Sequence, residues 1–262
     1  MTPAAKTPSS SVGDLPSDHR YTYPPLNTPK PVADDVWIVD GPVIRFGMPW
    51  PKMPFPTRMT IVRIGGDLFV HSPTALDPGL RQAVEGLGTP RWIVGPNRIH
   101  YWWLPDWHAA YPRAAMYLAP GIREHAKRPL DFEATELTAE TGWPWDQAIA
   151  TLPVAGGFMT EVVFFHRPSR TLVLTDLIEN FEPGKLGGCL MRWATRLAGV
   201  QDPRGSMPRD MRLTFRKQRP ALKAAVERMI AWDPARIVLA HGRWYDRDGA
   251  AELRRAFAWV LE

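Results

Sequence analysis

Three apolar segments of the chain each end in a side chain that can bind a metal ion or move a proton. The segment WIVGPNRIH ends at His100, TLVLTD ends at Asp176, and RIVLAH ends at His241. Polar residues that follow the strands of an α/β sheet gather where its loops meet, so these three side chains are expected to lie together. Two imidazoles and one carboxylate suit Zn²⁺, Fe²⁺ or Mn²⁺. Without a metal, Asp176 could orient either histidine as a general base, or the three could form an inert polar network.

The sequence also predicts the strands and helices that would hold these side chains in place. Apolar runs predict strands within residues 34–46, 57–73, 91–97, 114–120, 161–176 and 236–242, with turns at Asp40-Gly41, at Gly65-Gly66-Asp67 and at residues 167–170. Apolar spacing and helix-end residues predict helices within residues 76–88, 105–112, 185–199, 219–234 and 248–262. Strands and helices that alternate in this way indicate an α/β fold.

Individual residues mark the ends and faces of these helices. Asp77 is expected to cap the helix within residues 76–88, and Asp248 the C-terminal helix. The helix within residues 185–199 carries one apolar stripe, made of Leu186, Cys189, Leu190, Trp193 and Leu197, with Arg192 and Arg196 off it. Cys189 is the single cysteine, which excludes an internal disulfide, and it is expected to be a small buried side chain.

Composition narrows the class of protein. Of 262 residues, 45% are hydrophobic and 23% charged, as in a globular protein. The net charge is +5, but the basic residues are mixed with acidic ones, so no nucleic-acid partner is expected. No apolar stretch of about 18 residues and no signal sequence are found, so we expect a cytoplasmic protein without a membrane partner. Residues 1–33 are rich in proline and predict a disordered or draped arm, and residues 34–262 one domain.

Several of these segments together resemble the metallo-β-lactamase superfamily. The resemblance covers roughly residues 35–262 and is carried by LVLTDLIEN and IVLAHG in this order. Wider segments, such as MPFPTRMTIVRI and MPRDMRLTF, resemble an uncharacterised domain family allied to that superfamily. The resemblance implies a four-layer αββα sandwich built from two similar halves, with a metal site at one edge of its sheets.

The metal-binding signatures of that superfamily are only partly present. If the last histidine of H-x-H-x-D-H is His100, the other three ligand positions hold Gly95, Asn97 and Ile99. The third histidine of the first metal site falls on Gly157. Asp176 and His241 match the bridging aspartate and the final histidine. The resemblance therefore implies no dinuclear zinc centre, because glycine has no donor and asparagine is a poor ligand. It leaves either one metal ion (Zn, Fe or Mn) on His100, Asp176 and His241, or no metal.

The surroundings of these residues suggest a pocket for a small molecule. Aromatic residues follow both histidines, and the candidate substrate-binding residues are Asn97, Trp102, Trp103, Trp244, Arg209 and Arg212. His71 is a supporting candidate. The tryptophans could instead complete the core, and the arginines could form a solvated basic face.

Two hypotheses follow for the function. The first is a hydrolase of a small ester, lactone or acyl substrate with at most a mononuclear metal site. The second is a metal-free pseudoenzyme that binds a small molecule or partner without turnover. Whether the protein is an enzyme, and its oligomeric state, stay open at this point.

Overall fold

The first of the two β-sheets contains the N-terminal half of the chain. The computed structural model describes residues 19–46 and 53–262, with only the backbone of Phe46 and Met53. Antiparallel pairing joins the first four strands, and parallel pairing joins the last four. In spatial order the strands are β1 (Lys30–Ala33), β2 (Val36–Phe46), β3 (Met53–Ile64), β4 (Asp67–His71), β5 (Thr89–Gly95), β6 (Ala115–Leu118) and β7 (Thr135–Glu136).

The second sheet contains four strands from the C-terminal half. Their spatial order is β11 (Arg236–Leu239), β10 (Thr171–Leu174), β9 (Thr160–His166) and β8 (Ile149–Ala155). The pair β10–β11 is parallel, whereas β8, β9 and β10 are antiparallel to their neighbours. The predicted hairpins β3–β4 and β9–β10 are both confirmed.

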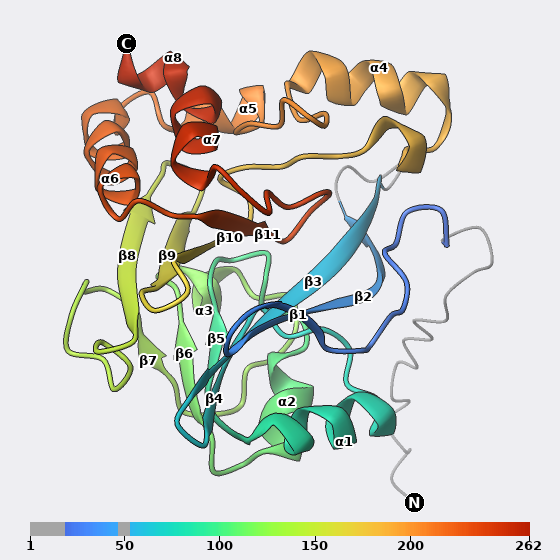
Figure 1. The fold of residues 1–262 in the computed structure, drawn as a ribbon, viewed down its shortest axis with the longest axis vertical. Helices are drawn as coiled ribbons and strands as arrows, with labels where there is room; N and C mark the ends of the chain where they lie inside the picture. Colours follow the sequence, from blue (N-terminus) through green and yellow to red (C-terminus); the bar gives the residue numbers. More distant parts are fainter. Residues whose placement is uncertain (1–18, 47–52) are drawn as a thin grey trace, which may run out of the picture.

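Helices cover the outer face of each sheet, so the layers follow the order αββα (Figure 1). The helices α1 (Pro78–Leu87) and α2 (Leu104–Ala110) pack on β5, and α3 (Ile122–His125) follows β6. On the other side α6 (Arg219–Ala231) packs on β8, and α7 (Gly249–Ala256) on β11. Smaller elements are η2 (Pro183–Lys185), α4 (Gly188–Ala198), α5 (Arg209–Thr214) and α8 (Ala258–Leu261). The predicted αββα sandwich is therefore confirmed.

Two apolar clusters hold the layers together. One lies between the sheets and under α1 and α2, and includes Phe69, Trp145 and Phe164. The other lies between the second sheet and α6–α8, and includes Phe165, Leu239 and Phe257. Each cluster buries aromatic and branched side chains, the main favourable term in folding. Among the described residues no helix is long and apolar enough to cross a bilayer.

The local predictions for helix ends have different outcomes. Asp77 caps α1 as predicted, because its Oδ1 accepts a hydrogen bond from the backbone N–H of Leu80 at 2.8 Å. Asp248 stands at the N-cap position of α7, but its side chain makes no capping hydrogen bond. The predicted turn at Asp40-Gly41 is wrong, because both residues lie inside β2, next to a bulge. A Cβ on Gly41 would lie 2.6 Å from Thr57 Oγ1, so close strand packing explains this glycine.

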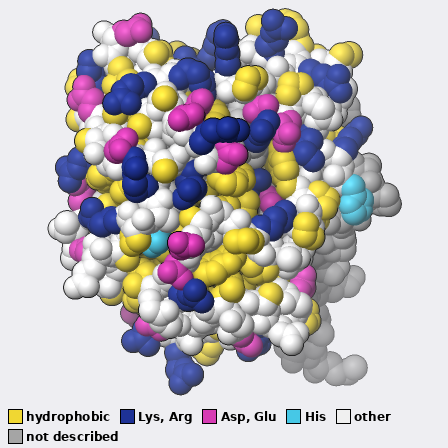
Figure 2. Space-filling view, viewed as in Figure 1, with side chains coloured by type: hydrophobic (Ala, Val, Ile, Leu, Met, Phe, Trp, Pro, Cys, Tyr) yellow, Lys and Arg dark blue, Asp and Glu magenta, His cyan; other side chains and the backbone are white. Residues whose placement is uncertain are grey.

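The apolar stripe of α4 does not pack on the core, and the prediction that Cys189 is buried is wrong because it lies on this exposed side. Leu190, Trp193 and Leu197 are exposed, Cys189 is exposed as well, and Thr195 is the buried residue of the helix. The upper part of Figure 2, where Figure 1 has α4 and α5, shows hydrophobic side chains among lysines and arginines. The helix period was evident from the sequence, but the direction that its apolar side faces was not.

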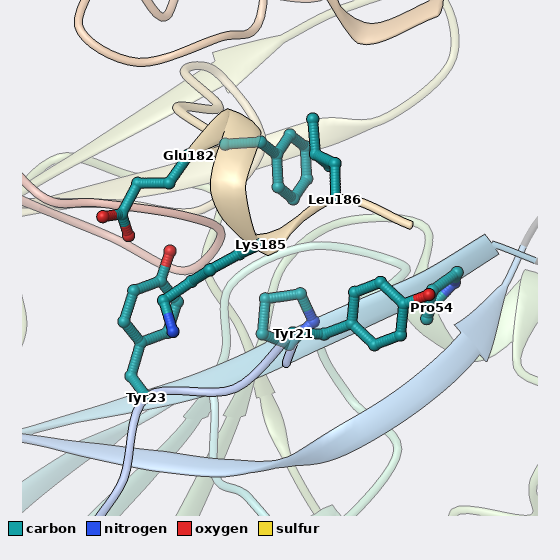
Figure 3. Close-up of a pocket in the computed structure, with 8 residues that line it drawn as sticks. Tyr21, Tyr23, Pro54, Glu182, Lys185 and Leu186 are labelled. Carbon is teal, nitrogen blue, oxygen red and sulfur yellow. The ribbon is translucent and has the colours of Figure 1, made fainter. Parts of the chain in front are cut away.

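The N-terminal arm is described from residue 19 onward, and residues 1–18 lie outside the described part. Figure 3 shows Tyr21 and Tyr23 facing Glu182, Lys185 and Leu186 across a small pocket. The Lys185 ammonium donates to the carbonyl of residue 22 at 2.7 Å and lies 4.4 Å from the centre of the Tyr23 ring. Burial, followed by a hydrogen bond with Glu182, raises the pKa of Tyr23. This part of the arm is therefore draped on the domain, and β1 extends the first sheet.

A buried arginine joins the two sheets. Arg58 on β3 pairs with Asp40 directly opposite on β2, with a distance of 2.8 Å from Nε to Oδ1. Its Nη1 donates to the carbonyls of Leu239 at 2.6 Å and Gly242 at 2.8 Å. Lys30 also pairs with Asp40, at 2.7 Å. The Arg58 guanidinium therefore binds Asp40 of the first sheet and, at the same time, backbone carbonyls at the end of β11 in the second sheet.

We predict that Arg58→Met lowers the free energy of unfolding by about 3–5 kcal/mol, because it leaves Asp40 buried with a weaker partner and two carbonyls without donors. Urea unfolding followed by circular dichroism measures the change. The matched control is Arg63→Met on the same strand, whose partially exposed pair with Asp35 should contribute less than about 1 kcal/mol. Equal losses in the two variants would contradict the structural role given to Arg58.

Candidate functional site

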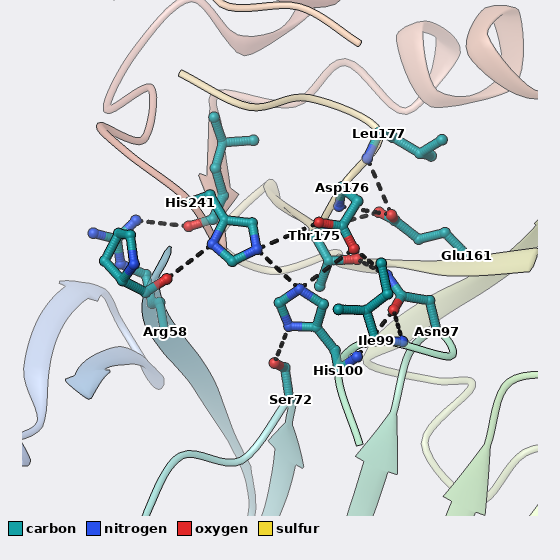
Figure 4. A network of polar contacts seen from close by, with 12 residues as sticks. Arg58, Ser72, Asn97, Ile99, His100, Glu161, Thr175, Asp176, Leu177 and His241 are labelled. Carbon is teal, nitrogen blue, oxygen red and sulfur yellow. Dashed lines mark hydrogen bonds and ion pairs between the residues drawn. The ribbon is translucent and has the colours of Figure 1, made fainter. Parts of the chain in front are cut away.

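The three residues predicted to bind metal or catalyse meet at one end of the sandwich (Figure 4). His100 lies in the loop after β5, Asp176 follows β10, and His241 follows β11. Their ligand atoms all lie within 4.8 Å of one another. The Nε2 atoms of the histidines are 3.1 Å apart, and Asp176 lies 3.4 Å from His100 Nε2 through Oδ2 and 3.3 Å from His241 Nε2 through Oδ1. The side chains are almost completely buried, with 3–6% exposed.

The other ring nitrogen of each histidine has its own partner. His241 Nδ1 lies 2.9 Å from the carbonyl of Pro56, and because a carbonyl only accepts, Nδ1 carries the proton. When His241 is neutral, its Nε2 therefore presents a lone pair to Asp176 and His100. His100 Nδ1 lies 2.8 Å from Ser72 Oγ, a hydroxyl that can either donate or accept. Ser72 has a φ of 52°, which is unfavourable for a residue other than glycine. Backbone strain of this kind is common at functional sites.

Asp176 is held both through its backbone and through its carboxylate. Glu161 at the start of β9 accepts hydrogen bonds from three consecutive backbone N–H groups, those of Thr175, Asp176 and Leu177, at 2.7–3.0 Å. Asn97 donates to Asp176 Oδ2 at 2.6 Å. Burial opposes ionisation of Asp176, but the two histidines outweigh it and lower its pKa. Burial and then the neighbouring Asp176 raise the pKa of Glu161 to about 7, although its N–H donors act in the opposite direction.

The donor set fits one transition-metal ion. In a tetrahedral zinc site with bonds of about 2.0 Å, ligand atoms lie about 3.3 Å apart. The three separations here, 3.1, 3.3 and 3.4 Å, match that spacing. A backbone carbonyl and a hydroxyl on the outer ring nitrogens are also what histidine ligands usually have. Asp176 supplies negative charge. The proton of His241 is on Nδ1, which leaves the Nε2 lone pair free to bind a metal ion.

The positions where the resembled superfamily has its other ligands are filled by packing. A Cβ on Gly95 would lie 2.9 Å from Leu104 Cδ1, and one on Gly157 would lie 2.6 Å from the backbone carbonyl of Thr214. Asn97 is wholly buried and uses its amide on Asp176 and on Thr175. Because these positions have no space for imidazoles, the first half of a dinuclear site is absent among the described residues.

Asn97 also shapes the loop that presents His100. Its Oδ1 accepts hydrogen bonds from the backbone N–H groups of Ile99 at 2.8 Å and His100 at 3.0 Å. Its Nδ2 reaches across to the second sheet. This side chain was predicted to bind substrate, and the structure places it beneath the site with both ends of its amide occupied.

A small pocket beside His100 is lined by two of the predicted tryptophans. Trp102 and Trp103 line it together with Ile44, Thr57, Ser72, Pro73, Ile99 and His100. Trp102 is 37% exposed and Trp103 is 8% exposed. The cavity has a volume of about 10 Å³, the space of one water molecule. Its wall is mostly apolar, and the polar groups that reach it belong to Thr57, Ser72 and His100.

The other predicted substrate-binding residues do not line this pocket. Trp244 is half-buried and packs against both apolar clusters. Arg209 is exposed, and Arg212 donates to the carbonyl of Met207 and to Ser206 Oγ while lying over the Trp259 ring. The structure therefore brings together the residues at the three strand ends but not the arginines.

Four residues that support the site were not predicted from the sequence. Ser72, Glu161 and the Arg58–Asp40 pair hold the three central side chains or the backbone beside them. Ser72 follows directly after β4, the same kind of position that drew attention to His100, and this signal could have identified it. Glu161 and Arg58 stand within strand patterns, where a charged residue is easily assigned to the solvent face.

His71 lies at the end of β4, buried beside the site. Its Nε2 has no hydrogen-bond partner among the described residues, and its ring meets Phe164 edge-on at 5.4 Å. Burial, helped by the neighbouring His100, lowers the pKa of His71 from 6.5 to about 3. His71 is thus a neutral core residue at neutral pH, and its supporting role stays a prediction.

A protein-family model matches more than half of the chain. Residues 34–185 match the family described as a domain of unknown function, DUF4336. The match spans more than half of the chain, so this protein belongs to that family. Among the curated proteins, none matches the chain in sequence.

The solved structures that resemble the chain include metallo-β-lactamases. The DIM-1 enzyme exposed to ceftazidime has a TM-score of 0.60 at 11% identity, over 88% of this chain and 95% of that one. An enzyme from Hirschia baltica has 0.56 at 15%, over 88% and 96%. The FIM-1 enzyme from Pseudomonas aeruginosa, in its mono-zinc form, has 0.55 at 13%, over 90% and 96%. At such low identity the likeness establishes the metallo-β-lactamase fold alone.

We predict that His71 makes the protein less stable in acid. The folded-state pKa near 3 lies below the unfolded value of 6.5, so the unfolded chain binds a proton first as the pH falls. Stability present above pH 6.5 is then lost toward pH 3, at up to about 1.4 kcal/mol per pH unit. Urea unfolding between about pH 7 and 4 should show a shallower loss for His71→Phe than for the exposed control His125→Phe. Parallel curves for the two variants would refute the assignment.

Proposed function

We propose that the protein binds a single transition-metal ion through His100, Asp176 and His241, and that this site hydrolyses a small ester or lactone. The observation that carries the proposal is the near-equal spacing of the three donor atoms, 3.1–3.4 Å, with the outer nitrogen of each imidazole already bonded. A structural relative was solved in a mono-zinc form, so one ion suffices to occupy a site of this fold. Zinc, iron and manganese all accept such ligands.

When bound, the ion would acidify a water and polarise a substrate carbonyl. The chain's own residues supply the rest. Ser72 and the Pro56 carbonyl orient the two imidazoles, and Glu161 and Asn97 keep Asp176 aimed between them. Ile99 and the two tryptophans beside His100 make the apolar wall that a small acyl group would meet. The substrate class rests on this wall and on the fold.

A second candidate is a metal-free protein that binds without turnover. Two observations favour it: the pocket beside His100 has room for only about one water molecule, and the network can satisfy itself without a metal. If Ser72 donates to His100 Nδ1, then His100 Nε2 carries a proton toward His241 and Asp176. The Ser72 hydroxyl thus suits both states. It donates to His100 Nδ1 in the metal-free protein and accepts from it when His100 Nε2 binds a metal.

Metal content separates the two candidates. We expect about one equivalent of a transition metal in the untagged protein by elemental mass spectrometry, and none in His241→Ala. The control His166→Ala removes a buried histidine that is bonded to Ser169, away from the donor set, and should keep the metal. Ser72→Ala should weaken metal binding about 10- to 100-fold, because it removes an outer partner of His100. Protein that stays metal-free after dialysis against Zn²⁺ and Mn²⁺ favours the second candidate.

Turnover provides an independent test. The metal-loaded protein should hydrolyse small nitrophenyl esters or lactones, and Asp176→Asn should reduce kcat/KM at least about 100-fold because the substituted amide is a poor ligand. Circular dichroism verifies that the variant is folded. A folded Asp176→Asn protein with unchanged activity would show that any hydrolysis takes place elsewhere.

A further inference from the structure

The helix α4 presents its apolar side to solvent. Leu190 is 76% exposed, Trp193 62% and Leu197 48%, at a spacing that places them along one side of the helix. The opposite side rests on polar contacts, in which Thr195 and Gln201 bond to each other and to backbone carbonyls of the helix. A soluble surface helix normally turns its apolar side inward, so this inverted arrangement indicates a surface that contacts something else.

This helix is connected closely to the candidate site. The segment that contains it leaves the domain at Phe181 and returns at residues 200–202, and backbone hydrogen bonds of 2.7 and 2.9 Å join the two ends. The Phe181 ring stacks on His241, with 6.3 Å between centroids and 20° between planes. A contact made by α4 would therefore lie one short segment away from the buried histidines.

The charge on α4 itself is positive, and the nearest acidic residues in the sequence are Glu182, Asp202 and Asp210. Residues 183–201 contain no aspartate or glutamate, and Arg192 and Arg196 on the helix are exposed. Exposed basic side chains continue along the neighbouring segment at Arg204, Arg209, Arg216 and Lys217. None of these six forms an ion pair within the described part of the chain. Figure 2 shows this mixture of blue and yellow over the upper part of the molecule.

We propose that α4 docks the protein on an anionic membrane surface, with Trp193 and the two leucines entering the lipid interface. Exposed apolar residues with tryptophan, flanked by arginines, are typical of helices that lie in a membrane interface. A second copy of the chain is a poorer partner, because it would bring the two sets of arginines together without acidic partners. This proposal departs from the expectation, drawn from the sequence, that the protein has no membrane partner. That expectation rested on the lack of a spanning segment, and surface binding requires none. The proposal is independent of the metal site.

The single cysteine makes this proposal directly testable. Cys189 is exposed on α4, so an environment-sensitive fluorophore attached to it reports on the surroundings of the helix. Full-length protein is mixed with vesicles of phosphatidylglycerol and phosphatidylcholine, or of phosphatidylcholine alone. We expect a blue-shifted signal and co-sedimentation of the unlabelled protein with the anionic vesicles, weakened by added salt. Absence of binding to both vesicle types would overturn the proposal.

Substitutions on α4 separate the apolar and electrostatic contributions. Leu190→Ser combined with Trp193→Ser and Leu197→Ser should reduce partitioning about 100-fold. Arg192→Gln combined with Arg196→Gln should reduce it about tenfold.

Matched controls lie on elements away from α4. Phe158→Ser removes another exposed ring, and the pair Arg91→Gln with Arg167→Gln removes two exposed charges on β5 and in the β9–β10 turn. All control variants should bind like the wild type. Equal losses in control and α4 variants would refute the role of α4. Self-association without vesicles, abolished by the triple serine variant, would identify a second copy as the occupant instead.

Discussion

The Arg58–Asp40 pair is the interaction on which the rest of the site depends. His100 is carried by the first sheet, and Asp176 and His241 by the second, so the site exists only while the two sheets keep their relative position. Apolar packing alone tolerates small sliding of one sheet over another, because the hydrophobic effect is not directional. A buried guanidinium with three defined partners, Asp40 and the carbonyls of Leu239 and Gly242, does not, because any shift would leave a charge or a carbonyl unpaired. This arrangement fixes the distance between the histidines.

Local packing, rather than this pair, closes the positions where the resembled superfamily has its other metal ligands. Packing occupies the positions of the other metal ligands: Gly157 lies against the backbone of α5, and Gly95 lies against leucine and isoleucine side chains. Asn97 provides the hydrogen bond to Asp176 that keeps the carboxylate oriented. Each of the three donor residues has a further hydrogen-bond partner. His100 has Ser72, His241 has the Pro56 carbonyl, and Asp176 has Asn97.

The exposed helix and the buried site illustrate opposite uses of apolar residues. At the site, Ile99 and the tryptophans exclude water from a polar group of three, which strengthens every electrostatic interaction within it. On α4, leucines and a tryptophan remain in water, which is unfavourable unless another surface covers them. Because Phe181 contacts His241 and also begins the segment that carries α4, the two features belong to one continuous part of the molecule.

The sequence by itself determined the fold class, both hairpins, the capped helix α1 and the three residues at the strand ends. Those features depend on local periodicity, which can be seen in the sequence, and on the rule that the ends of neighbouring parallel strands meet at one edge of a sheet. The tertiary structure alone decided the rest. Arg58 and Glu161 stand within strand patterns, and only the packing of two sheets shows that their charges point inward. The stripe on α4 has the same period whether it faces the core or solvent, since periodicity defines a helix face but not what covers it.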